Sequence, residues 1–114
     1  MTIPKFLISF GIALALLSPL TAGVSSAQDS AAYQKEIMDA HKKMMGDMMS
    51  MKPSGNADMD FAMMMIPHHR GAVDMAETEL KYGKDPTLKR MAKQIIAAQK
   101  KEIKEFKKWQ SEHH

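Results

Sequence analysis

The sequence predicts an all-α protein, a short up-down helical bundle of three helices joined by short loops. Two groups of turn-forming residues, 53–56 and 83–86, divide the chain into segments of helical length. Within these segments apolar residues recur every three or four positions, and no stretch alternates apolar and polar residues as a half-buried strand would. Short loops make successive helices antiparallel, so we expect a three-helix bundle or half of a larger one.

A segment typical of an export signal precedes the helices. Lys5 is followed by an apolar run at residues 6–17 and by the small residues 25–27, which signal peptidases recognise. The apolar run is too short to cross a bilayer, which takes about 20 residues, and no later segment is apolar enough. We therefore expect a cleavable signal peptide at residues 1–27, and a periplasmic or otherwise exported protein with no membrane span after cleavage.

The expected mature chain, residues 28–114, is a single small domain. The sequence contains no cysteine, so disulfides cannot stabilise it, and a metal ion is the other common solution for small exported domains. Removing Lys5 from the 16 basic residues of the chain leaves 15, against 13 acidic ones, which gives a net charge of about +2. This balance argues against nucleic acid or a membrane surface as the partner.

The first helix is predicted from about residue 30 to residue 51. At 100° per residue, one of its faces carries an imidazole and three thioethers: His41, Met44, Met45 and Met48. Methionine can simply fill a core, which is the alternative interpretation. The segment has one isoleucine and no leucine or valine, however, whereas a core normally mixes several aliphatic types. We therefore interpret the cluster as a set of metal ligands.

The second helix is predicted over residues 57–82 and ends before Gly83. A narrow stripe along it combines a carboxylate, two thioethers, an imidazole and a glycine: Asp60, Met64, His68, Gly71 and Met75. His68 and the two methionines are the predicted ligands there, with Asp60 as a supporting group. Pro67 removes one backbone hydrogen bond, so the helix is expected to bend there, unless a separate helix begins at this residue.

Met65 and His69 lie about 100° away from this stripe, on the apolar face of the second helix. Both remain candidate ligands, although this position makes His69 a weaker candidate than His68. The alternative for His69 is a buried histidine whose ring is hydrogen-bonded within the core.

The third helix is predicted to begin at Pro86, with Asp85 as its N-cap. Its apolar stripe contains two polar residues, Gln99 and Glu102. Because buried polar groups need partners, we expect one of the two to orient a histidine of the second helix across the bundle. The alternative is that both lie at the margin of the stripe and reach water or the lysines at 42–43.

Thioether sulfur and imidazole nitrogen without thiolate form a selective set of ligands. Soft methionine sulfur favours Cu(I), and an oxidising compartment makes cysteine an unreliable ligand because it forms disulfides. Zinc or nickel would leave the sulfur atoms without a role. A ferritin-type di-iron centre would require Glu-x-x-His pairs, and the sequence has none. The predicted cofactor is therefore copper, as Cu(I).

One stretch of the chain also resembles a known family. Residues 58–109 contain the spaced run Met65, His68, His69, Ala72 and Met75, followed by Ile95, Gln99, Glu102 and Ile103. This pattern is similar to the domain of unknown function 305 family, whose members resemble ferritin-like helical bundles. Several members are exported copper-binding proteins linked to copper tolerance. The resemblance implies the same role here. It also implies that the site consists of Met65, His68, His69 and Met75.

From these observations we expect a non-enzymatic periplasmic protein that buffers or carries Cu(I). An envelope protein that delivers or exports copper is the expected partner, and a homodimer is an alternative to a monomer because a second copy could supply a fourth helical face. A different interpretation is an envelope-stress chaperone whose methionines form an adaptable surface for unfolded clients. A metal-dependent enzyme, or an accessory factor for a copper enzyme, is a third.

Overall fold

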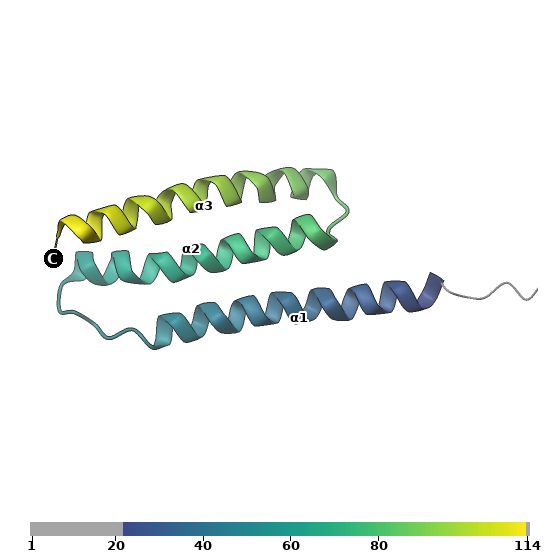
Figure 1. Cartoon of the computed structure of the whole chain (residues 1–114), viewed down its shortest axis with the longest axis horizontal. Helices are drawn as coiled ribbons and strands as arrows, with labels where there is room; N and C mark the ends of the chain where they lie inside the picture. The colour runs from purple at the N-terminus through teal and green to yellow at the C-terminus, as the bar shows by residue number, and fades with distance from the viewer. Residues whose placement is uncertain (1–21, 114) are drawn as a thin grey trace, which may run out of the picture.

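The computed structural model of the protein describes residues 22–113, with side chains from residue 26 onward. Three α-helices make up most of this part of the chain: α1, Ala22–Met49; α2, Ala57–Tyr82; and α3, Pro86–Glu112. Figure 1 shows them side by side, each antiparallel to the one before it. The predicted all-α fold is confirmed. Among the described residues, no helix is long and apolar enough to cross a membrane.

Helix α1 begins and ends earlier than the predicted span of residues 30–51. Residues 22–29 contain no proline, so nothing in the sequence stops the helix from extending toward the N-terminus. At the other end, Pro53 disfavours a helical conformation for the residue before it, and the helix stops at Met49. The predicted cleavage position, after Ala27, falls inside α1, while residues 1–21 lie outside the described residues. The export signal stays a prediction.

Helix α2 has the predicted bounds because capping residues fix both of its ends. The Asn56 side chain accepts a hydrogen bond from the Met59 N–H at 3.0 Å, and Gly55 supplies the left-handed turn before it, with φ of 85°. At the far end, the Gly83 N–H donates to the Glu79 carbonyl at 2.8 Å. The helix continues through Pro67, so the alternative of a separate helix beginning there is wrong.

Helix α3 begins as predicted. The Asp85 side chain accepts from the Leu88 N–H at 2.8 Å, and Pro86 occupies the first turn, where its missing N–H removes no helical hydrogen bond. Of the three helices, α3 has the clearest division into an apolar side and a charged side, and lysines occupy most of the charged, exposed side. Its apolar stripe therefore has one partner to pack against, which is α2.

The three helices form an open layer in which α2 lies in the middle. Helix α2 contacts both neighbours, whereas α1 and α3 have no contact with each other within the described residues. Helix α2 accordingly has two buried strips. One carries Ile66, His69 and Val73 and packs against α3, and the other carries Gly71 and Thr78 and packs against α1.

The layer has two unlike faces. On one face, Lys100 of α3 pairs with Glu77 of α2 at 3.4 Å, and acidic and basic residues of α1 and α2 line the neighbouring groove. The opposite face is rich in methionine, and the contact between the Phe61 and Phe106 rings, 5.7 Å apart, joins α2 to α3 on that side. We call it the methionine face, and it consists of Ile37, His41, Met45 and Met48 of α1, Phe61, Met64, His68 and Met75 of α2, and Leu88, Met91 and Ile95 of α3.

Candidate metal centre

His69 is the one buried histidine among the described residues, with 6% of its surface exposed. Helix α2 directs its ring toward α3, where the Phe106 ring meets it edge-on at 5.5 Å. Its Nε2 lies 2.5 Å from the Glu102 Oε2. The predicted contact between a polar residue of the third helix and a histidine of the second is therefore confirmed, and Glu102 is the residue that makes it.

The second nitrogen of the His69 ring has no partner. Nδ1 is buried and makes no hydrogen bond to any described residue. An ionised carboxylate only accepts, so Nε2 carries a proton in this contact, and in the neutral form of the ring the lone pair is then on Nδ1. Leaving such a buried acceptor without a partner costs roughly 1–3 kcal/mol. A carboxylate that orients an imidazole while the other nitrogen stays free is the arrangement typical of metal-ligating histidines.

Gln99, the other polar residue of the stripe, is half-buried one turn before Glu102. Its side chain makes no hydrogen bond within residues 22–113. The alternative pairing of these residues with the lysines at 42–43 does not occur, and Lys43 pairs instead with Asp47 at 2.6 Å. The Glu102 side chain is 48% exposed, however, so this residue does lie at the margin of the stripe and reaches water as well as His69.

His68 belongs to a different surface. Its ring is exposed, and its centroid lies 6.3 Å from that of His69 with the ring planes at 60°. Met64 and Met75, one turn before and two turns after it, are 44% and 43% exposed. The structure therefore presents the predicted stripe of His68 and its methionines on the open methionine face, beside α1.

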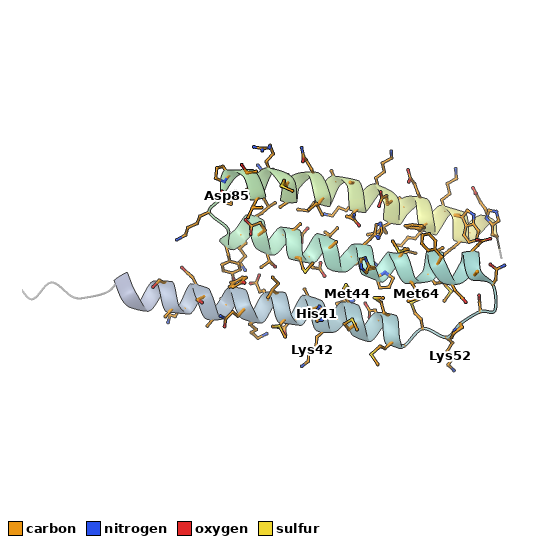
Figure 2. The ribbon with its side chains drawn as sticks, turned by 180° about the vertical axis from the view of Figure 1, so that it is seen from behind. His41, Lys42, Met44, Lys52, Met64 and Asp85 are labelled. Atoms are coloured by element: carbon orange, nitrogen blue, oxygen red, sulfur yellow. The ribbon has the colours of Figure 1, made fainter. Side chains whose placement is uncertain are left out.

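Gly71 explains how α1 approaches this stripe. A Cβ atom at Gly71 would lie 2.5 Å from the Met44 sulfur and 2.9 Å from the Met44 Cγ, so a side chain at this position would collide with α1. The absence of a side chain allows the half-buried Met44 to pack on the backbone of α2, one turn from His68. Figure 2 shows Met44 and Met64 between the two helices, with His41 on α1 beside them.

The remaining candidates of α1 lie at the edge of this interface. His41 is exposed, Met45 is 40% exposed and Met48 is half-buried. They share a face with Met44, as the helical spacing predicted, but they line the open side of the layer instead of a closed core.

The Asp60 side chain accepts hydrogen bonds from the loop that joins α1 and α2. Its Oδ1 accepts from the Ser54 N–H at 2.7 Å and from the Ser54 hydroxyl at 2.6 Å. These hydrogen bonds, that of the hydroxyl first, hold the pKa of the Asp60 carboxyl below its ordinary value of 3.8. Asp60 thus holds the start of α2 in place, one turn before Met64.

The structure divides the predicted ligands between two surfaces of α2. His69, with Met65 one turn before it and half-buried, lies on the side of α3. His68 and Met75 lie on the side of α1, because adjacent helical positions differ by about 100°. Within residues 22–113, no three or more histidine, aspartate or glutamate side chains are grouped so that they could hold a metal ion.

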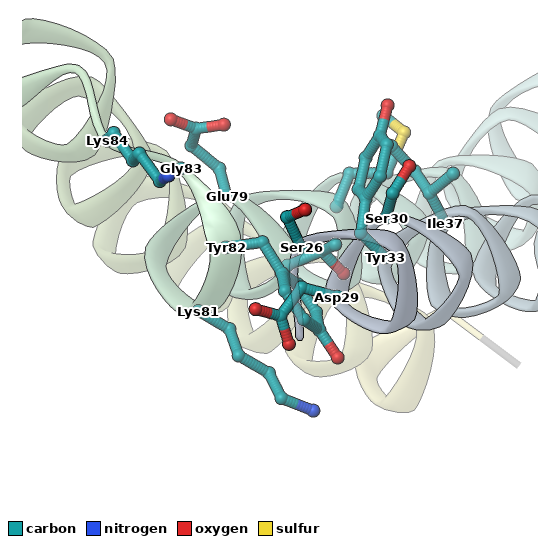
Figure 3. A pocket seen from close by; sticks show the side chains of 12 residues that line it. Ser26, Asp29, Ser30, Tyr33, Ile37, Glu79, Lys81, Tyr82, Gly83 and Lys84 are labelled. Atoms are coloured by element: carbon teal, nitrogen blue, oxygen red, sulfur yellow. The ribbon is translucent and has the colours of Figure 1, made fainter. Parts of the chain in front are cut away.

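Sequence reasoning missed a groove at the other end of the α1–α2 interface. It has a volume of about 950 Å³ and is lined by residues of both helices, among them Met75. Figure 3 shows the groove with Tyr33 and Tyr82 in its lining. Tyr33 and Tyr82 meet in it with ring centroids 6.3 Å apart, and the Tyr82 hydroxyl donates to Glu36 at 2.8 Å. Hydrogen bonds from Lys81 and then Tyr82 hold the pKa of Glu36 below its ordinary value. The two tyrosines of the chain, Tyr33 and Tyr82, were the signal for this contact in the sequence.

The comparisons with known proteins agree with the motif around His68 and His69. A search of curated proteins found no match. A family model described as Domain of unknown function (DUF305) matches residues 16–110, which include all three helices except the last two residues of α3. The chain therefore belongs to the DUF305 family.

Proposed function

We propose that the protein binds Cu(I) through methionine and histidine side chains and buffers or carries the ion, contributing to copper tolerance outside the cytoplasm. The observation that carries this proposal is the His69 ring, which is buried, oriented by Glu102 at Nε2 and unpartnered at Nδ1. Met65, one turn before His69, is the nearest thioether along that side of α2. A soft ion at Nδ1 would provide the missing partner.

The second group of candidates supports the same ion. His68 lies in a stripe with Met64 and Met75, and Met44 reaches the same part of α2 from α1. Thioether sulfur prefers Cu(I) to Zn(II), Mg(II) or Ca(II), so the abundance of methionine around both histidines favours copper. The role is binding and transfer, because the candidate groups are ligands and their surroundings offer no nucleophile paired with a base.

The test is an anaerobic Cu(I) competition titration of the purified protein. Glu102→Gln keeps the size of the side chain but removes the charge that orients His69, and it should weaken Cu(I) binding by about 10- to 100-fold. Met38→Leu is the matched control, because Met38 is a 59% exposed methionine of α1 outside the predicted ligand set. The proposal is contradicted if Glu102→Gln binds Cu(I) as tightly as Met38→Leu, or if the parent binds Zn(II) more tightly than Cu(I).

A second candidate function rests on the exposed methionine face. Flexible methionine side chains adapt to many apolar partners, so this face suits a chaperone that holds unfolded clients. Suppression of client aggregation by the metal-free protein, with weak Cu(I) binding, would support this function in place of copper transfer.

A further inference from the structure

The methionine face is the largest feature of the structure that the proposed copper site leaves unexplained. Seven of its large apolar side chains, such as Phe61, Met91 and Ile95, expose between 39% and 58% of their surface. The face runs across all three helices, because α1 and α3 lie on opposite sides of α2 and neither folds over it. Contiguous apolar surface on this scale marks a site of interaction.

The exposed area matches what a stable interface requires. With roughly 200 Å² for a large side chain, seven side chains exposed by a little under half present on the order of 700 Å² of apolar surface. A standard protein–protein interface buries about 800 Å² on each partner. The half-buried Ile37 and Met48 extend the face further, so its area is sufficient for one partner of similar size.

The charges of the face favour a second copy of the chain as that partner. Ionic groups gather on the opposite side of the layer, where Lys100 pairs with Glu77. The eleven residues that define the methionine face include no Asp, Glu, Lys or Arg. Glu102 lies beside the face, with 48% of its side chain exposed and its carboxylate hydrogen-bonded to His69. A two-fold symmetric interface can therefore bring the apolar parts of two identical faces together while each Glu102 stays at the margin, paired with its own His69.

We propose that the methionine face is the interface of a homodimer, in which two three-helix layers pack face to face. Each layer then buries the apolar side chains that it cannot cover itself, and the dimer has the closed core that one layer lacks. The same contact encloses His68, Met64 and Met75 with their counterparts from the second copy. The statement that copper bound there is held between two copies rests on the proposed function, whereas the dimer does not.

The test is sedimentation-velocity analysis of the metal-free protein, purified from cells that produce the full chain, over a range of concentrations. The parent should sediment as a dimer. Met91→Glu places a charge in the interface at a side chain that is 48% exposed, and it should raise the dissociation constant by at least about tenfold. Gln94→Glu is the matched control, because it adds the same charge to the solvent side of α3 and should leave the dimer unchanged.

Ile95→Gln repeats the test without adding a charge, and circular dichroism checks that each variant keeps its helical content. In the dimer, Met64 and Met91 should resist oxidation by hydrogen peroxide, which peptide mass spectrometry measures. The Met91→Glu variant should lose the protection of Met64.

A parent that stays monomeric at its highest soluble concentration overturns the proposal, as does a dimer that both interface variants leave intact. Binding of the monomer to lipid vesicles or to unfolded protein would assign the face to those partners instead. These measurements use no copper, so the dimer and the copper site are tested separately.

Discussion

Gly71 is the residue at which an α1 side chain reaches the backbone of α2. The sequence placed this glycine in a stripe of candidate ligands, where its purpose was not apparent. The structure provides the reason, because the Met44 sulfur occupies the space that a Cβ atom would need. A glycine inside a helix costs up to about 1 kcal/mol relative to alanine, so its presence here is explained by close packing of the two helices.

We predict that Gly71→Ala lowers the free energy of unfolding by about 1–3 kcal/mol, because the new methyl group forces Met44 out of its position. Urea denaturation measures the change. Gly46→Ala is the control: no described atom lies within 4 Å of the corresponding Cβ position, so this change should raise stability by up to about 1 kcal/mol. Combining Gly71→Ala with Met44→Ala should recover part of the loss. Equal effects of the two glycine substitutions would contradict this account.

Single residues differed in how far the sequence could predict them. The pairing of Glu102 with a histidine was predicted from the place of the carboxylate in an apolar stripe, although His69 is the buried member of the pair and Glu102 is 48% exposed. The free Nδ1 of His69 could not be predicted, because it depends on which ring nitrogen meets the carboxylate. The bond between Asp60 and Ser54 was also missed, because it joins a loop to a helix and has no periodic signature.

At the scale of helices, local signals decided how well the bounds were predicted. The bounds of α2 and the start of α3 follow from caps, since Asn56 and Asp85 each accept a backbone N–H of the first turn. Helix α1 has no comparable stop signal on its N-terminal side between residues 22 and 29, and its start was predicted eight residues too late, at residue 30 instead of 22. The C-terminal end of α1 was predicted within two residues because proline follows closely.

Helix α1 depends on α2 alone for its position within the described residues. Glu36 links the two helices, because its carboxylate accepts hydrogen bonds from Lys81 and from the Tyr82 hydroxyl. Tyr33 packs against the ring of Tyr82 beside this link. The docking of α1 therefore includes an ionised contact whose strength varies with pH.

We predict that acid loosens α1 before it affects α2. The folded pKa of Glu36 is lowered, so its contribution is complete above the ordinary carboxyl pKa of 4.5 and is lost as pH falls through the lowered value. After correction for intrinsic rates, hydrogen exchange should show α1 losing protection over this acidic range. Glu36→Gln should already be less protected at neutral pH, with a smaller response to acid. Asp39→Asn is the control, because Asp39 pairs with Lys35 inside α1, and equal effects of both changes would refute the prediction.

The sequence could not predict how the three helices are arranged relative to one another. Each helix showed an amphipathic pattern, which predicts that one face is buried but not which helix covers it. Helix α2 is apolar around much of its circumference, and this is consistent with a central position between two neighbours. Whether the outer helices also meet depends on the angle between the two buried strips of α2. In the structure that angle is wide, so the candidate ligands near α1 lie on an open face and His69 lies on the side of α3.

The copper proposal makes a prediction for the stability of the whole molecule. An ion that binds the folded chain alone stabilises it by RT ln(1 + [L]/Kd), or about 2.7 kcal/mol when free Cu(I) is 100 times Kd. Anaerobic calorimetry should therefore show a higher melting temperature with Cu(I) than with the same concentration of Zn(II), because the thioethers favour the softer ion. His68→Gln changes a side chain that is exposed in the single chain, so the Cu(I)-induced shift of this variant is measured from its own metal-free melting temperature. If the two histidines belong to separate sites, this variant should keep the part of the Cu(I) stabilisation that His69 provides. An unchanged melting temperature of the parent under saturating Cu(I) would contradict binding to the folded protein, since a ligand that prefers the folded state must raise it.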